Sequence, residues 1–260
     1  MKLCLLALLL LMSPASVLAT PAPDLSSFTY VQRPGSQLPL NAVLRDEAGR
    51  GVQLSELLGG KPLILALVYF HCPNLCGIVR ADLFNALGET GMAAGRDYTL
   101  VALSIDPSET SADATAAKAE DLSRYPLSGA EQGWHFLTGP ANAVQAVAAA
   151  VGFRDRFDPE LKQFIHPAGI VFLTPKGIVS SYLLGVGYRA ADVRLAVTRA
   201  DRGTIAAAAL PILLLCYHYD PATGRYTLAI IKLLRLAAGI TVVTIGGTLF
   251  LAFRRERRGG

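Results

Sequence analysis

Cysteine is scarce in this sequence, and its scarcity excludes one class of protein. Only four cysteines occur among 260 residues. Cys4 lies in an N-terminal apolar run that is expected to be absent from the mature protein, which leaves Cys72, Cys76 and Cys216. So few cysteines, in an odd number, do not make the disulfide scaffold of a small exported protein. They indicate reactive or metal-binding thiols instead.

Several other patterns are missing as well. The sequence has no HExxH motif, no glycine-rich loop of the kind that holds phosphate and no Ser/His/Asp order, so these common enzyme sites are not expected. It also lacks a basic stripe interleaved with aromatic residues. The arginines within residues 254–258 account for most of the net charge of +4. Nucleic-acid binding is therefore not expected.

Apolar residues make up 52% of the chain, and their excess lies at the two ends. Residues 1–19 combine one lysine, a short apolar run and a small-residue cleavage site, which is typical of a secretory signal peptide. An uncleaved anchor is the alternative. Residues 236–253 carry no charge and can cross a bilayer core. The arginines of the basic tail, residues 254–260, predict a cytoplasmic C-terminus. We therefore expect a bacterial-type inner-membrane protein with a single C-terminal span and a functional domain in the periplasm.

One α/β domain is expected between the two ends, at residues 37–200. It follows a Pro-, Ser- and Ala-rich linker at 20–36 and precedes a juxtamembrane segment at 201–235. Continuous apolar runs indicate buried strands. The pattern as a whole predicts a hairpin over 41–54 and strands at 63–70, 98–105, 134–137, 170–174 and 178–184. It also predicts helices at 76–94, 108–124, 141–151 and from about 190. This alternation predicts a mixed sheet covered by helices on both faces.

Cys72 and Cys76 are placed where a buried strand is followed by a helix. Side chains four positions apart on a helix lie about 5–6 Å from each other. Two thiols at that distance can bind one small ion or form a disulfide, and the helix N-terminus favours the thiolate in either role. Thiolates are soft ligands that select Cu(I), zinc or iron–sulfur centres. A structural zinc site needs two further ligands, and none stands beside this pair.

Several segments in order resemble the Sco/SenC family of copper proteins that take part in cytochrome c oxidase assembly. The resemblance covers about residues 40–188 and rests on the segments Val68–Cys76, Val101–Pro107, Trp134–Gly139 and Ile165–Pro167. It implies a thioredoxin-like fold: an α/β mixed sheet flanked by helices, here with a C-terminal transmembrane helix. It also implies one copper ion per chain, Cu(I) or Cu(II), bound by Cys72, Cys76 and His166. The implied partner is subunit II of cytochrome c oxidase.

Three departures from the family pattern accompany the resemblance. Gly77 stands where proline is common, Pro107–Thr110 lacks an Arg-Asp pair, and Pro167 follows the histidine in place of a small polar residue. None of them removes an implied ligand. The first two can alter the surface that meets a partner, and Pro167 can stiffen the loop that carries His166.

The other candidate residues have simpler interpretations. His71 is expected to line the loop and His135 to be structural. Cys216 and His218 could share one face of a strand and bind a second soft metal, but a turn between extended segments is the preferred interpretation. Asp106, Asp155 and Asp158 could act as acid/base groups, but Asp106-Pro107 is better explained as a strand end and Asp158-Pro159 as a turn.

Three functions fit these residues. The first is a membrane-anchored metallochaperone that delivers copper to the copper site of oxidase subunit II. The second is a thiol–disulfide oxidoreductase, with Cys72 and Cys76 as its redox pair, that reduces the client's cysteines. The third is a copper or redox sensor. The oxidoreductase is weakened by its three intervening residues, because the usual redox motif has two.

Overall fold

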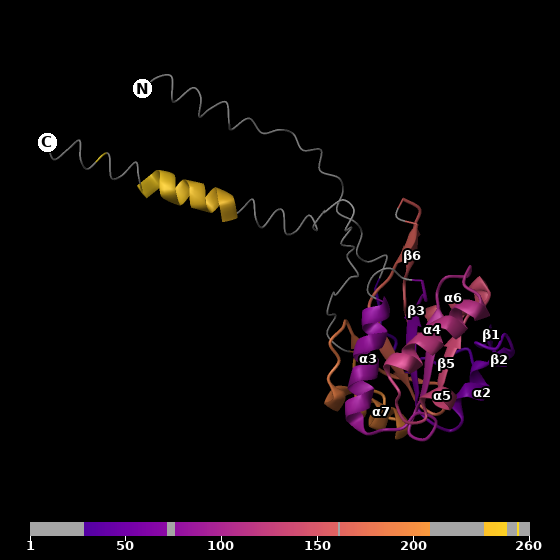
Figure 1. Ribbon diagram of the computed structural model, residues 1–260. Helices are drawn as coiled ribbons and strands as arrows, with labels where there is room; N and C mark the ends of the chain where they lie inside the picture. Colours follow the sequence, from indigo (N-terminus) through magenta and orange to yellow (C-terminus); the bar gives the residue numbers. More distant parts are fainter. Residues whose placement is uncertain (1–28, 72–75, 161, 209–236, 249–253, 255–260) are drawn as a thin grey trace.

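The computed structural model describes residues 29–71, 76–160, 162–208, 237–248 and 254 (Figure 1). Within them, five strands form a sheet with the order β5-β4-β3-β8-β9. The strands are β3 (Leu63–Val68), β4 (Thr99–Ser104), β5 (Trp134–Leu137), β8 (Gly169–Leu173) and β9 (Val179–Leu184). The first three are parallel, whereas β8 and β9 are antiparallel to their neighbours. The sequence prediction of a mixed sheet is confirmed.

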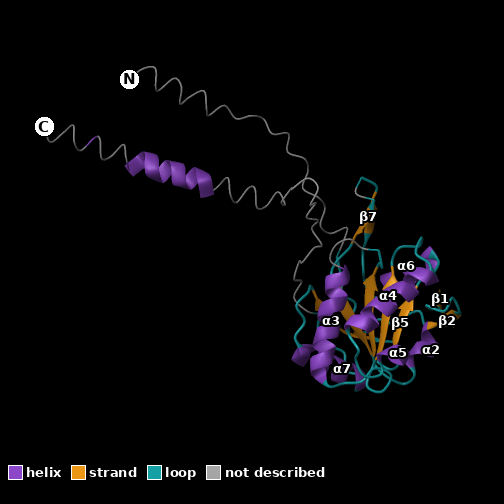
Figure 2. Cartoon of the chain, viewed as in Figure 1, coloured by secondary structure: helices purple, strands orange, loops and turns teal. Residues whose placement is uncertain are grey.

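Helices cover both faces of this sheet (Figure 2). Every residue of β3, β4 and β8 is buried, and since successive side chains of a strand point to opposite faces, both faces must be covered. The helices are α2 (Leu54–Leu58), α3 (Cys76–Thr90), α4 (Ser111–Arg124), α5 (Ala130–Gly133), α6 (Ala141–Ala150) and α7 (Ala190–Asp201). Helices α3 and α7 pack against each other, and α4 packs against β5.

Two small hairpins lie beside the main sheet. Strands β1 (Val43–Arg45) and β2 (Gly51–Gln53) form the hairpin that the sequence predicts. Strands β6 (Arg156–Asp158) and β7 (Gln163–Ile165) form a second hairpin, which projects from the domain in Figure 1. The sequence indicates only a turn there, at Asp158-Pro159, because three-residue strands are too short to show a period.

The ends of two helices differ from the prediction. Helix α3 ends at Thr90 and not at Ala94, because Gly91 has a positive φ of 71° and takes the left-handed position after the helix. Helix α4 begins at Ser111, with Thr110 as its N-cap, and not at the predicted residue 108. The Thr110 amide donates to Asp113 Oδ2 at 2.7 Å, which forms a capping box. The Ser108 hydroxyl donates to Asp106 Oδ1 instead.

The packed domain begins before the predicted boundary at residue 37. Tyr30 is buried, and its ring contacts Phe153 at a centroid distance of 5.3 Å. The Val31 amide also donates to Gly152 O at 2.7 Å. Residues 29–36, which the composition assigns to the linker, therefore pack on the domain. The sequence analysis missed this packing, because a proline-rich composition does not reveal a single buried tyrosine.

Residues 237–248 form a helix, whereas Leu236 and residues 249–253 of the predicted span lie outside the described residues. Among the helices of the described ranges, none combines the length and the apolar character that crossing a membrane requires.

Candidate functional site

The cysteine pair belongs to the connection between β3 and α3. Strand β3 ends at Val68, and α3 begins at Cys76, so the pair follows the carboxyl end of a central parallel strand. Ligand sites of open α/β sheets lie at that end of the strands. Residues 72–75 and the side chain of Cys76 lie outside the described residues. The predicted strand-to-helix junction is confirmed.

His166 approaches the same region from a distant part of the chain. It lies between β7 and β8 and is only 2% exposed. Its ring packs edge-on against Tyr69 at a centroid distance of 5.9 Å, and in a tilted arrangement against Phe153, also at 5.9 Å. Tyr69 stands three positions before Cys72. The fold therefore brings His166 beside the backbone that leads into the cysteine pair.

The hydrogen bond of the His166 ring assigns its tautomer. Nδ1 lies 3.1 Å from the carbonyl oxygen of Pro167. A carbonyl oxygen can only accept a hydrogen bond, so a bond at this contact requires the tautomer with the proton on Nδ1. In the neutral ring the lone pair is then on Nε2, which is the nitrogen able to bind a metal. The bond to Pro167 uses only the main chain of that residue, so its proline ring leaves the interaction intact.

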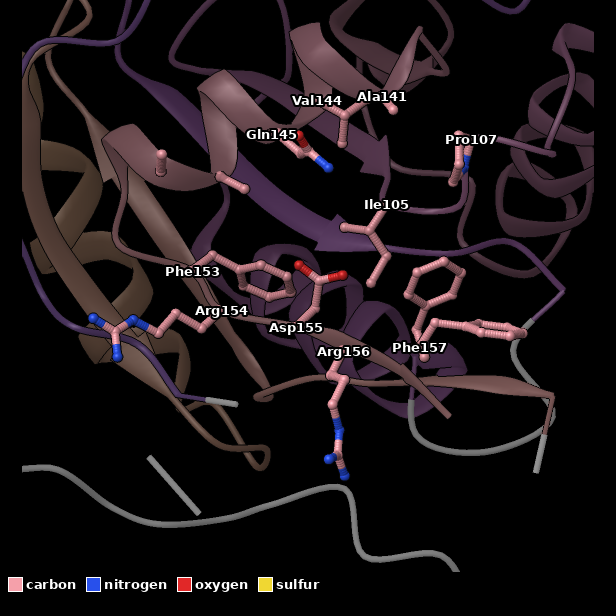
Figure 3. A pocket seen from close by; sticks show the side chains of 13 residues that line it. Ile105, Pro107, Ala141, Val144, Gln145, Phe153, Arg154, Asp155, Arg156 and Phe157 are labelled. Carbon is pink, nitrogen blue, oxygen red and sulfur yellow. The ribbon is translucent and has the colours of Figure 1, made fainter. Parts of the chain in front are cut away.

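A pocket of about 590 Å³, drawn in Figure 3, lies near this histidine through their common neighbour Phe153. Phe153, which contacts the His166 ring, lines the pocket together with Phe164 and Ile105. The carboxylate of Asp155 points into it in Figure 3. Burial raises the pKa of Asp155, and the nearby His166 offsets part of that rise. The His166 ring thus contacts both Tyr69, three positions before Cys72, and Phe153, which lines this pocket.

Comparison with known proteins identifies the family. A model of SCO1/SenC matches residues 42–194, which is more than half of the chain. The chain belongs to the SCO1/SenC family. A crystal structure of a protein from Aquifex aeolicus shares 27% identity with it at a TM-score of 0.58, and covers 66% of this chain and 96% of its own.

Solved Sco structures share the fold of this SCO1/SenC protein. Arabidopsis thaliana ScoI with copper bound has 19% identity, a TM-score of 0.52 and a coverage of 66% of this chain and 99% of its own. BsSco, a Sco family member with a disulfide switch, has 21% identity, a TM-score of 0.51 and a coverage of 65% and 96%. The thioredoxin-like architecture expected from the resemblance is confirmed. Among curated protein sequences, none gives a significant match.

His71 of this SCO1/SenC protein is exposed, and two carboxylates hold its ring. Nδ1 lies 3.1 Å from Glu109 Oε1, and Nε2 lies 3.5 Å from Asp113 Oδ1. The ring is 69% exposed, whereas the side chain of Glu109 is only 3% exposed. The expectation that His71 lines the loop agrees with this position. The sequence analysis missed Glu109, and no local pattern marks it, because its contacts join segments far apart in the chain.

The remaining candidates have structural roles or lie outside the described residues. His135 is part of β5, and burial lowers its pKa. Asp106 follows β4 and accepts from the Ser108 amide, as a strand end requires. Asp158 ends β6. Cys216 and His218 lie outside the described residues. Among the side chains that the structure describes, no three His, Cys, Asp or Glu residues are grouped to hold a metal ion, and that search includes neither Cys72 nor Cys76.

Proposed function

We propose that this protein is a metallochaperone that binds one copper ion through Cys72, Cys76 and His166. The observation that supports this most directly is the packing of the His166 ring against Tyr69, beside the entry to the cysteine pair. The Nε2 lone pair of His166 and two thiolates form a donor set that suits copper in either oxidation state. Copper is the cargo here, and it would be passed on by ligand exchange.

The recipient that we propose is the copper site of cytochrome c oxidase subunit II. Two facts support it: membership of the SCO1/SenC family, and the description of BsSco as one of the cytochrome c oxidase assembly proteins. Copper is present in the structure of Arabidopsis thaliana ScoI, which shares the fold. Both cysteines belong to the connection between a strand end and a helix N-terminus, and the proposal requires that a partner's ligands can reach their thiolates there.

The double variant Cys72→Ser, Cys76→Ser tests the site. Purified full-length wild type is expected to retain about one copper per chain and to show a visible thiolate-to-Cu(II) charge-transfer band, because thiolates are strong soft ligands. The double variant should retain less than about a tenth of that copper, since a hydroxyl is a poor substitute for a thiolate. Metal analysis by mass spectrometry measures both values. Stoichiometric copper in the double variant would refute the assignment.

A thiol–disulfide oxidoreductase is the second candidate. It is favoured by the position of Cys76 at the first residue of α3, because a helix N-terminus lowers the pKa of a thiol. The disulfide switch described for BsSco is in line with such chemistry. In this function the two thiols would reduce the client's cysteines before copper arrives, and no metal would be required. His166 separates the two candidates, as the Discussion describes.

We also propose that residues 236–253 anchor the protein in the inner membrane, with the domain in the periplasm. The uncharged run and the arginines that follow it support this topology. A reporter that folds only in the cytoplasm, fused after Gly260, is expected to be active. A reporter that requires export, fused at the same place, should stay inactive. The opposite pair of results would contradict the proposed orientation.

A further inference from the structure

A buried carboxylate lies beside the backbone that leads into Cys72. It belongs to Glu109, which follows β4 and precedes α4. The side chain is 3% exposed, although glutamate is rarely buried unless it is paired. Its burial therefore calls for an explanation.

Both carboxylate oxygens of Glu109 accept hydrogen bonds from the segment before Cys72. Oε2 accepts from the Phe70 amide at 2.9 Å, and Oε1 accepts from the His71 amide at 2.7 Å. The Ser104 hydroxyl donates to Oε2 at 2.5 Å. The His71 ring adds its contact with Oε1. Charge-assisted bonds of this length are about twice as strong as neutral ones.

These bonds begin where the sheet stops. The paired register of β3 and β4 ends at Val68 and Ser104, and the Ile105 amide donates to Val68 O at 2.7 Å. Beyond that point the amides of Phe70 and His71 point to the Glu109 carboxylate rather than to a neighbouring strand. The side chain thus continues the strand's hydrogen bonding up to the residue before Cys72.

The arrangement requires a carboxylate and not an amide. Each oxygen of Glu109 faces a backbone N–H, and an N–H can only donate. A glutamine of the same size would have to turn its NH₂ group towards one of these two amides. Two donors would then face each other in a buried site, and one of them would lose its bond.

We infer that Glu109 is a positioning residue for the metal site: it fixes the backbone that enters Cys72, and thereby the position of that thiolate relative to His166. This inference rests on the proposed copper-binding function. It assigns to Glu109 a role through the backbone of Phe70 and His71, and no direct contact with the metal. The His71 ring is secondary in this role, because the main-chain amide of His71 makes a shorter bond to Glu109 Oε1, at 2.7 Å, than the ring does, at 3.1 Å.

Copper titration of Glu109→Gln tests the inference in the full-length chain. Copper affinity is expected to fall about 10- to 100-fold, the usual effect of losing a group that orients a ligand. The thiolate-to-Cu(II) band of the remaining complex should shift, because its geometry depends on the position of Cys72. Glu109→Asp keeps the acceptors but withdraws them by one methylene, so it should shift the band in the same direction with a smaller loss of affinity. It also replaces the glutamine variant if that variant does not fold.

Asp46→Asn is the matched control. Asp46 is also a buried carboxylate that accepts from two backbone amides, those of Ala48 at 3.0 Å and Arg50 at 2.8 Å, but it does so in the β1–β2 turn. Its amide variant should lower the melting temperature while it leaves the copper affinity within about twofold of wild type and the band unmoved. A general loss of stability would affect copper binding in both variants alike.

Hydrogen exchange tests the anchor without copper. In Glu109→Gln at least one of the amides of Phe70 and His71 should exchange about tenfold faster or more, whereas those of β4 stay protected. If wild type binds no copper, the proposed function fails while the exchange result still reports the anchor. If wild type binds copper and the Glu109 variants fold with unchanged affinity, band and amide exchange, the positioning role is overturned.

Discussion

Copper retention should fall from about one ion per chain to below about a tenth in the variant His166→Ala, because two thiolates alone leave the site without its imidazole ligand. Thiol–disulfide exchange of the Cys72/Cys76 pair with a small dithiol should persist in the same variant, since on the protein side that reaction uses only the two cysteine sulfurs. Metal analysis and a dithiol exchange assay on one preparation measure both quantities. Loss of copper with retained exchange is the result that our metallochaperone site predicts.

His166 is buried, so its removal also changes the packing. The ring contacts Phe153 and Tyr69, and truncation to alanine leaves a cavity between them. Phe153→Ala is the matched control, because it removes a neighbouring ring from the same cluster and no proposed ligand. It should cost about 3–5 kcal/mol of stability and still retain copper. Equal copper loss in both variants would assign the effect of His166→Ala to packing.

A loss of about 3–5 kcal/mol in the free energy of unfolding is expected for Arg80→Met, because it leaves a buried charge without its partner. Arg80 lies on α3, and its Nε donates to Asp121 Oδ2 on α4 at 2.7 Å. The two side chains are only 8% and 6% exposed. Urea unfolding followed by circular dichroism measures the change. Arg124→Ala serves as the comparison: it breaks an exposed ion pair with Glu120, also on α4, and should cost less than about 1 kcal/mol in the free energy of unfolding.

The loss in Arg80→Met should shrink on acidification. Burial raises the pKa of Asp121, and Arg80 offsets only part of this rise. Without Arg80 the folded-state pKa rises further above the unfolded value. A folded state that binds an extra proton loses stability as pH rises from the unfolded pKa to the folded one. The variant should therefore be closest to wild type at about pH 4, near the unfolded pKa of an aspartate. An equal gap at pH 4 and pH 7 would contradict this explanation.

The double variant Arg80→Met, Asp121→Leu separates charge from shape. Replacing both partners of a buried ion pair by apolar groups of similar volume is often neutral or stabilising. The double variant should therefore regain most of the stability that Arg80→Met loses. Failure to regain it would show that the two residues contribute mainly through packing with other parts of α3 and α4.

Most of the fold could be predicted from local patterns. The apolar runs at β3 and β4 require burial on both faces, whatever the remainder of the chain does, and so they indicate a covered parallel sheet. The hairpin of β1 and β2 has its own turn residues. By contrast, β6 and β7 are three residues each, and the burial of Tyr30 depends on Phe153, more than one hundred positions away. No local period reports such a contact.

The candidate site divides in the same way. The cysteine spacing and its junction between strand and helix are local features, so the sequence indicates them without a structure. The contact of His166 with Tyr69 and the bonds of Glu109 to the amides of Phe70 and His71 join residues about 40 to 100 positions apart. The sequence shows which residue types suit copper, but it does not give the distances between residues that lie far apart in the chain.

The sequence alone determined the covered mixed sheet, the junction that carries Cys72 and Cys76, and the family to which the resemblance pointed, because each depends on neighbouring residues. Only the tertiary structure decided that His166 is buried against Tyr69, that its Nδ1 lies beside the carbonyl oxygen of Pro167, and that Glu109 holds the amides before Cys72. Those facts depend on which distant backbone groups the fold leaves without a strand partner and on which side chains come close enough to bond to them.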